Sequence, residues 1–96
     1  MEPIVRNNTQ AARYELVLDD RVIGVADYHV RGDVVVLPHT EIVRPLQGNG
    51  LGAILVQGAL DDIRASGRKV VPQCWYVAQH MREHPELADL RAPATS

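Results

Sequence analysis

The residues best suited to chemistry lie in one stretch near the middle of the chain, where Gly48, Gly50 and Gly52 alternate with other residues. Glycine has no Cβ and takes positive φ readily, so such a run turns sharply and lets a ligand approach the backbone. An amphipathic helical pattern begins as the glycines end, and a helix start presents free N–H groups and a positive dipole end. Together these features predict a cradle for an anion, most often a phosphate or a pyrophosphate.

Two familiar glycine-rich loops match this stretch only in part. A P-loop requires Lys and then Ser or Thr after its last glycine, whereas Leu51 and Ala53 stand here. Gly48, Gly50 and Ala53 do match the dinucleotide-binding pattern G-x-G-x-x-G/A. That pattern belongs to the first strand–helix turn of a longer chain, with an acidic residue about 20 positions later. Residues 68–73 contain no carboxylate, so a Rossmann-like nucleotide binder is the weaker alternative.

The stretch Gln47–Gly52 resembles the acyl-CoA signature of the GNAT N-acetyltransferase superfamily, Gln/Arg-x-x-Gly-x-Gly/Ala. The resemblance continues in His39–Val43 upstream and in Cys74 and Arg82–Leu87 downstream. These stretches are similar to the small, minimal GNAT-like proteins of about this length, and together they cover most of residues 12–90. The resemblance implies that acetyl-CoA is the co-substrate and that the glycine loop holds its pyrophosphate.

Under this resemblance, the CoA-binding residues lie at the end of one strand and in the loop after it. Main chain of that strand would pair with the pantetheine arm where the fourth and fifth strands splay apart. Backbone N–H groups of residues 49–53 would hold the pyrophosphate, and Arg44 either adds positive charge or is a solvated surface residue. The residues expected to bind CoA are Ile42, Val43, Arg44, Gln47, Gly48, Asn49, Gly50, Leu51, Gly52 and Ala53.

Three side chains are candidates for the transfer itself. Glu41, on the opposite strand face from Ile42, is either a general base, suited to that task by partial burial, or a solvated residue. His39, on the same face as Glu41, is the alternative base or a histidine packed beside Pro38. Cys74, the single cysteine, stands at the carboxyl end of a predicted strand. It is a covalent nucleophile, a wall of the thioester pocket or an inert buried thiol.

Two further patterns in the predicted last helix have ordinary alternatives. Tyr76 resembles the tyrosine that protonates the leaving thiolate in many GNAT enzymes, although that tyrosine usually lies further along the helix. The alternative is an aromatic side chain packed beside Trp75. His80 and His84 stand four apart, a spacing that can chelate a metal, but no third ligand is evident, so we expect no metal.

The first half of the chain reads as an antiparallel meander. Residues 12–18 and 22–30 form a predicted hairpin around a turn at Asp19, Asp20 and Arg21, and residues 34–37 form a further strand. Pro38 leaves open whether residues 39–43 continue that strand or form a fourth one. In larger GNAT proteins two helices follow the first strand and wall the acceptor pocket. The early turn leaves no room for them, which implies an open acceptor site.

The second half of the chain changes to a helical period. Apolar residues spaced four apart predict a helix over residues 50–66, and Gly58 within it would let the helix lie close to the sheet. A short strand over 69–74 and a helix over 75–83 follow, which implies a right-handed parallel crossover. The predicted fold class is α/β (α+β): a GNAT-type fold with an antiparallel meander and then β-α-β-α around a splayed mixed sheet, in a minimal version lacking the first helices.

Composition agrees with an ordinary soluble globule of one domain. The chain has 96 residues, 46% of them hydrophobic, with a predicted core over 12–90 and a disordered tail over 91–96. A net charge of −2 argues against nucleic acid as a partner. One cysteine cannot form an internal disulfide, and no stretch has the length of a membrane span or signal peptide, so we expect a cytoplasmic protein.

These observations and the resemblance together predict an acetyl-CoA-dependent N-acetyltransferase. The open site suits an amine on a protein or peptide, either a lysine or an N-terminus. The alternative is a non-catalytic CoA- or acyl-CoA-binding module that acts through a protein partner. Turnover on a panel of amines, at equal CoA affinity, separates the two.

Overall fold

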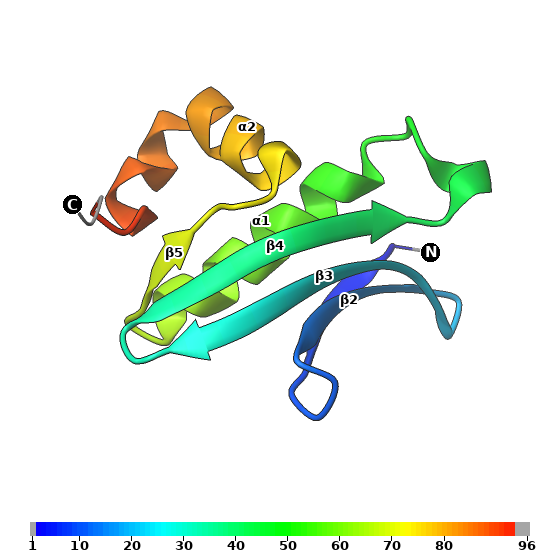
Figure 1. The fold of residues 1–96 in the computed structure, drawn as a ribbon. Coiled ribbons are helices and arrows are strands. Elements are labelled where there is room, and N and C mark those ends of the chain that lie inside the picture. Colours follow the sequence, from blue (N-terminus) through cyan, green and yellow to red (C-terminus); the bar gives the residue numbers. More distant parts are fainter. Residues whose placement is uncertain (1, 94–96) are drawn as a thin grey trace.

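The chain folds into one mixed five-stranded sheet with helices packed along it (Figure 1). The computed structural model describes residues 2–93. The strands are β1 (Ile4–Asn8), β2 (Arg13–Leu18), β3 (Arg21–Arg31), β4 (Val34–Ile42) and β5 (Lys69–Val71), in that order across the sheet. The helices are α1 (Leu51–Ala65) and α2 (Trp75–Glu83), with 3₁₀ turns η1 (Arg44–Leu46) and η2 (Pro85–Leu90). The first four strands are antiparallel and β5 is parallel to β4; the antiparallel order of β2, β3 and β4 and the parallel pairing of β5 agree with the sequence prediction.

The predicted hairpin between β2 and β3 is confirmed. Leu18 pairs with Arg21, and both residues between them have positive φ, 51° at Asp19 and 65° at Asp20. Two consecutive left-handed residues form the tight turn whose twist suits a two-residue hairpin, and aspartate tolerates this conformation better than most residues.

Strand β1 was not predicted from the sequence. Its letters, IVRNN, show little apolar alternation, and it pairs with β2 alone at the edge of the sheet. Val5 is its main contact with the core. The Val5 side chain lies so close to Gly58 of α1 that a Cβ on Gly58 would stand 2.5 Å from Val5 Cγ2. The absence of a side chain at Gly58 therefore lets α1 lie directly on β1, as expected for a close helix–sheet approach.

A buried carboxylate fixes β1 to β2. Glu15 is only 1% exposed, and it accepts hydrogen bonds from Arg6 Nε at 2.8 Å, Arg13 Nε at 2.8 Å and Asn8 Nδ2 at 3.1 Å. The flanking arginine side chains are themselves partly exposed, so a thin layer of side chains covers the carboxylate. Three donors to the charged form lower the pKa of Glu15 to about 2.

Strand β4 is one continuous strand, which settles the alternative left open at Pro38. Val36 pairs with His29, and His39 pairs with Asp27, so Leu37 and Pro38 stand opposite the single residue Tyr28. This extra residue is a β-bulge, a position that tolerates proline because the ladder is already interrupted there. The bulge shifts the alternation, so Thr40 and Ile42 follow Leu37 on the helical face.

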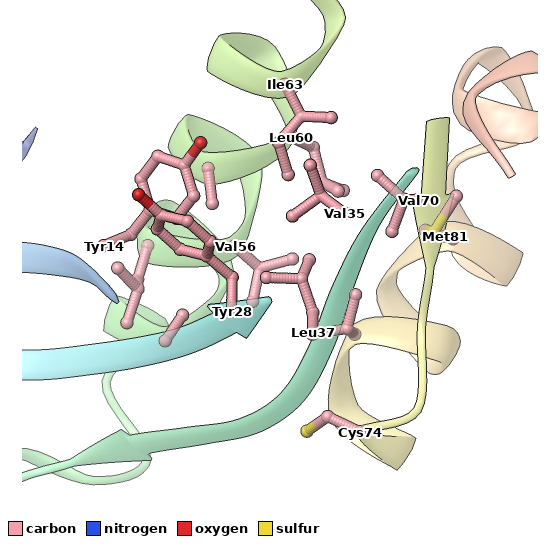
Figure 2. Close-up of a cluster of buried hydrophobic side chains, with 14 of the residues drawn as sticks. Tyr14, Tyr28, Val35, Leu37, Val56, Leu60, Ile63, Val70, Cys74 and Met81 are labelled. Atoms are coloured by element: carbon pink, nitrogen blue, oxygen red, sulfur yellow. The ribbon is translucent and has the colours of Figure 1, made fainter. Parts of the chain in front are cut away.

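The core fills the layer between one face of the sheet and the helices. The apolar stripe of α1 supplies Leu55, Val56, Ala59, Leu60 and Ile63, all nearly fully buried. They meet Tyr14, Tyr28, Val35 and Leu37 from the strands and Val77 and Met81 from α2 in one cluster (Figure 2). Polar contacts attach two other elements to α1: Arg64 of α1 binds Asp89 of η2 at 2.7 Å, and the hydroxyl of Tyr14 in β2 donates to Asp62 at 2.7 Å.

The chain after η2 differs in part from the predicted disordered tail. Arg91 forms a parallel bridge with Val70, and the Ala92 N–H donates to the Val70 carbonyl at 2.8 Å, so residues 91 and 92 are bound to β5 and are not disordered. Residues 94–96 lie outside the described residues. Between residues 2 and 93, no helix has the length and apolar character needed to cross a membrane.

Candidate functional site

A pocket of about 680 Å³ opens where β4 and β5 separate. Three segments enclose it: the second half of β4, the glycine loop with the start of α1, and the segment from the end of β5 into α2. The residues that line it are Pro38, His39, Thr40, Glu41, Ile42, Leu46, Gln47, Gly48, Gly50, Leu51, Gly52, Gln73, Cys74, Trp75 and Tyr76. Most of the residues predicted for catalysis and CoA binding therefore meet in one cavity.

The pocket exists because pairing between β4 and β5 stops halfway along β4. Only Val34–Val36 pairs with Lys69–Val71, and one more bond follows, from the Cys74 N–H to the Leu37 carbonyl at 2.9 Å. Beyond Leu37, the described part of β5 no longer accompanies β4. The main chain of residues 39–42 thus forms a strand edge along the pocket, with peptide groups directed sideways to a further strand-like partner.

The glycine loop takes a conformation that needs glycine at two positions. Gly48 has φ 86° and Gly50 has φ 75°, values that residues with a Cβ rarely adopt. No described atom lies within 4 Å of an added Cβ at either position, so the space above the loop is open. The Gln47 amide donates to the Ile42 carbonyl at 2.9 Å, and the Asn49 amide donates to the Leu46 carbonyl at 3.1 Å. These two side chains hold the loop in shape.

The N-terminus of α1 is uncapped and faces this loop. Gly50 is the N-cap residue, no side chain of the described residues caps the helix, and its first turn contains no acidic residue. The first intrahelical bond runs from the Ile54 N–H to the Gly50 carbonyl at 3.4 Å, so the N–H groups of residues 51–53 precede the helical ladder. Such donors, together with the helix dipole, attract an anion, as the sequence predicts.

Not every residue predicted to bind CoA lines the pocket. Ile42, Gln47, Gly48, Gly50, Leu51 and Gly52 line it, whereas Val43, Arg44, Asn49 and Ala53 do not. The Val43 N–H is used by the sheet, since it donates to the Ile23 carbonyl at 2.9 Å. Arg44 is exposed in η1, on the approach to the loop.

His39 and Glu41 lie together on the face of β4 that points away from the helices. Their Nε2 and Oε1 atoms are 3.4 Å apart, and the side chains are 54% and 66% exposed. Glu41 thus lies on the other face of β4 from Ile42, as predicted, but it lacks the partial burial that we expected of a general base. His39 is paired with Glu41, whereas the alternative placed it in packing beside Pro38. Both line the pocket, which is therefore reached from both faces of the splayed sheet.

Cys74 stands at the end of the buried cluster beside Leu37 (Figure 2). It is the N-cap residue of α2 and is 9% exposed, with its remaining surface on the pocket. Within residues 2–93, the thiol has no hydrogen-bonded histidine or carboxylate beside it, and His39 and Glu41 belong to the opposite strand face. An activated nucleophile normally has a base in hydrogen-bond reach. The geometry thus favours Cys74 as a wall of the pocket.

The two aromatic residues after Cys74 form the remaining wall. Trp75 and Tyr76 pack edge to face with ring centroids 5.7 Å apart, as the alternative for Tyr76 expects. The Tyr76 ring also lies against Gly52, so its hydroxyl reaches the first turn of α1. Tyr76 lies near the site as its sequence position predicts, but no pattern in the sequence indicates its contact with Gly52.

Thr40 also lines the pocket, although its sequence position does not predict it as a site residue. Its Oγ1 is buried and has no hydrogen-bond partner in the part of the chain that the structure describes. An unsatisfied buried hydroxyl costs about 1–3 kcal/mol, so such groups are uncommon away from binding sites. A threonine between His39 and Glu41 in a strand carries no pattern that distinguishes this role.

His80 and His84 each use one ring nitrogen in a contact within the fold. Their rings stack with centroids 4.1 Å apart; His80 Nε2 pairs with Gln57 Oε1 at 2.9 Å, and His84 Nδ1 pairs with the His80 carbonyl at 2.7 Å. Burial and the neighbouring His84 lower the pKa of His80. Across residues 2–93, no three His, Cys, Asp or Glu side chains gather as metal ligands would.

Comparison with known proteins identifies the family. A family model described as GCN5-related N-acetyl-transferase matches residues 13–90, which include every strand from β2 onward, both helices and the glycine loop. The chain belongs to the GCN5-related N-acetyltransferase (GNAT) family. The resemblance noted in the sequence is thereby confirmed.

Individual relatives agree with this assignment. The mouse protein NATD1 is 29% identical over 84 residues, covering 84% of this chain and 76% of the mouse protein. The human NATD1 is 32% identical over 66 residues, covering 69% of this chain and 58% of the human protein. The chicken NATD1 is likewise 32% identical over 66 residues, and the match spans 59% of that protein. The chain thus matches less than two thirds of the length of the human and chicken proteins.

A solved structure confirms the predicted GNAT-type fold. The solution structure of a GCN5-like protein from Staphylococcus aureus superimposes with a TM-score of 0.70, covering 96% of this chain and 90% of the other. Sequence identity is 14%, so the likeness concerns the fold. The minimal GNAT fold expected from the sequence is therefore correct, with β1 as an addition to the predicted meander.

Proposed function

We propose that this GNAT protein binds acetyl-CoA in the pocket between β4 and β5 and transfers the acetyl group to an amine. One observation carries the proposal: the open glycine loop and the uncapped start of α1 are continuous with a pocket that runs along the free edge of β4 to Cys74. Anion-binding donors at one end and an unpaired strand edge leading to Cys74 at the other suit a ligand that joins a pyrophosphate to an acylated arm.

The residues present fit such a ligand. The N–H groups of residues 51–53 have no partners in the helical ladder, and the space above Gly48 and Gly50 is open. The orphaned Thr40 hydroxyl lies in the pocket wall, where an incoming polar group or water would relieve it. A volume of about 680 Å³ lies within the range of about 300–1,000 Å³ that is usual for small-molecule sites.

Each segment of the pocket has a separate task in this proposal. The loop and the α1 N-terminus hold the pyrophosphate, the edge of β4 aligns the pantetheine arm, and Cys74 and Tyr76 enclose the thioester end. Acetyl-CoA supplies an activated acyl group. Catalysis by the protein then consists mainly of positioning, together with stabilisation of charge on the carbonyl oxygen by a backbone N–H of the β4 edge.

In this proposal, His39 and Glu41 on the outer face of β4 carry out the proton transfer. The acceptor amine must lose a proton as its nitrogen bonds to the acyl carbon, and Glu41 or His39 would accept that proton directly or through water. The C–S bond of the thioester breaks in the same transfer, and CoA would leave as a thiolate that takes up a proton from this pair or from water. Their separation of 3.4 Å lets the two act as one unit, with Glu41 holding the orientation of the imidazole. Cys74 forms no bond in this scheme.

Release of free thiol from acetyl-CoA in the presence of amines tests the proposal. A panel of lysine peptides, peptides with a free N-terminus and small amines should contain at least one acceptor that raises thiol release above hydrolysis. Glu41→Gln should lower kcat on that acceptor about 10²-fold, the usual contribution of a general base, with the acetyl-CoA affinity retained. A matched control is Glu83→Gln, which removes an exposed carboxylate outside the pocket. Thiol release independent of every amine would contradict the proposal.

A non-catalytic CoA-binding module is the second candidate. The observation that favours it is the exposure of Glu41 and His39, since a general base is usually tuned by partial burial. Under this alternative, acetyl-CoA binds to the wild-type protein and to Glu41→Gln equally, and no amine in the panel is acetylated.

A further inference from the structure

Trp75 is a large aromatic side chain left open at the mouth of the pocket. It is 71% exposed, although tryptophan is on average among the more buried residues. Its position is nonetheless defined: it is the first residue of α2, its ring packs edge to face on Tyr76, and Tyr76 in turn rests on Gly52. The Trp75 indole is therefore positioned by its contact with Tyr76, while most of its surface is exposed to solvent at the pocket rim.

Glu41 stands in the lining of the same pocket with its charge largely uncompensated. Its ion-pair partner among residues 2–93 is His39 at 3.4 Å, which is charged only when protonated. Three carboxylates elsewhere in the described fold do have firm partners: Glu15 is bound by two arginines, Asp89 by Arg64, and Asp62 by the Tyr14 hydroxyl. No described lysine or arginine nitrogen lies within 4.0 Å of Glu41.

Glu41 and Trp75 line one pocket from different sides, Glu41 from β4 and Trp75 from the start of α2, and a carboxylate and an indole are two groups that recognise an organic cation. The indole has the most favourable aromatic face for cations, and the carboxylate supplies direct electrostatic attraction. We propose that Trp75 and Glu41 form the acceptor subsite, and that this subsite takes the alkylammonium end of a lysine side chain. The inference rests on the proposed function, because the acceptor is the group that must meet the acyl donor in this pocket.

The shape of the rim selects lysine over a more compact amine. Trp75, Glu41 and His39 are all exposed, so the subsite lies at the surface and a bulky peptide can approach it. A lysine side chain carries its amine at the end of a flexible four-carbon stem, which lets the ammonium pass the indole while the peptide backbone stays outside. A peptide N-terminus has no such stem and would bring its backbone against Trp75.

The test uses Trp75 as its own reporter, since it is the single tryptophan of the chain. The purified protein, with CoA present, is titrated with a blocked peptide that contains one lysine while tryptophan fluorescence is recorded. The same peptide with norleucine in place of lysine keeps the stem and removes the charge. We expect a saturable change with the lysine peptide and none with the norleucine peptide at equal concentrations.

Variants assign the signal to the two residues. Glu41→Gln should weaken binding of the lysine peptide about threefold to tenfold by fluorescence, whereas Glu83→Gln should leave it unchanged. In the acetylation assay, Trp75→Leu should raise KM for the lysine peptide by a similar factor, and Trp75→Phe, which keeps an aromatic face, by less. Calorimetry should show the same acetyl-CoA affinity in all of them.

Three results would overturn the inference. An equal response to the norleucine peptide would mean an apolar contact, and a preference for a free N-terminus would exclude lysine as the acceptor. Loss of acetyl-CoA affinity in Trp75→Leu would assign the indole to the CoA site. Failure of the proposed function is seen separately, as absence of acetyl-CoA binding by calorimetry. A lysine-specific fluorescence change in that case would still place an alkylammonium site at Trp75.

Discussion

The phenol ring of Tyr76 lies against the backbone of Gly52, so closely that a Cβ on Gly52 would stand 2.7 Å from the Tyr76 hydroxyl and 2.9 Å from Cζ. This contact joins the first turn of α2 to the first turn of α1 across the pocket. The third glycine of the loop is thus required for space, whereas Gly48 and Gly50 are required for their positive φ.

The variant Gly52→Ala separates the effect of this contact on catalytic activity from its effect on stability. Alanine in a helix gains about 1 kcal/mol over glycine, which offsets part of the strain from displacing Tyr76. Thermal unfolding should therefore change little, while displacement of the ring lowers kcat/KM about tenfold or more. Adding Tyr76→Phe removes the nearest atom and should restore part of the activity. Unchanged activity in Gly52→Ala would show that the ring moves aside freely.

Gly58→Ala should instead destabilise the protein. The new methyl group would stand 2.5 Å from Val5 Cγ2 and 2.7 Å from Val5 Cβ, and a β-branched side chain on a paired strand has little freedom to move. Overpacking of this kind costs about 1–3 kcal/mol, more than the helix gains from alanine. Denaturant unfolding measures the loss. The double variant Val5→Ala with Gly58→Ala should recover stability, and purely additive effects would contradict the close contact between α1 and β1.

The Glu15 cluster predicts acid sensitivity with a defined sign. The pKa of Glu15 is lowered from 4.5 to about 2 by its three donors, so in this window the unfolded chain binds more protons than the folded one. The stabilisation is complete above about pH 4.5 and is lost as the pH falls through about 2. Glu15→Gln should be less stable than wild type at pH 7 by about 1–2 kcal/mol, because both arginines are partly exposed.

Denaturant unfolding at pH 7 and pH 3 checks this prediction. The difference between wild type and Glu15→Gln should shrink at pH 3, where protonation begins to offset the wild-type advantage. A difference that stays constant between the two pH values would mean that the carboxylate gains nothing from its arginine partners.

Cys74 should be dispensable for the chemical step. No described base is placed to activate its thiol, so we expect Cys74→Ala and Cys74→Ser to retain turnover within about tenfold of wild type, with changes due to packing. Intact-protein mass spectrometry during turnover should detect no acetyl adduct. An adduct that is absent in Cys74→Ser, together with loss of activity in both variants, would establish a covalent route.

Much of this fold could be predicted from sequence because its local patterns are strong. The period change after Gly52, the paired aspartates of the first hairpin and the motif at Gln47 each point to one structure. Strand β1 could not be predicted, because its stability comes from pairing with β2, from the ion pair of Arg6 with Glu15 of β2, and from the contact of Val5 with the distant Gly58. Whether residues 39–43 continue the strand before Pro38 could not be decided for a related reason, because the bulge at Pro38 depends on the register between β3 and β4.

The site was predictable where main chain defines it and less so where side chains meet across elements. Glycine at positions 48 and 50 indicates a backbone with positive φ, which the structure has at both. The burial of Glu15, the orphaned hydroxyl of Thr40 and the contact of Tyr76 with Gly52 all depend on which elements pack together. A single sequence read by period and motif contains no record of those tertiary neighbours.

Calorimetric titration of the purified protein with acetyl-CoA, with CoA and NAD as comparison ligands, tests the central claim most directly. The account predicts saturable binding of acetyl-CoA and CoA at micromolar concentrations and none of NAD. It also predicts weaker binding in Gly50→Ala, where φ of 75° strains the loop, than in Gly50→Asn, because asparagine tolerates that conformation. A well-folded protein that binds no acetyl-CoA would contradict the account, and membership of the GNAT family would then describe the fold alone.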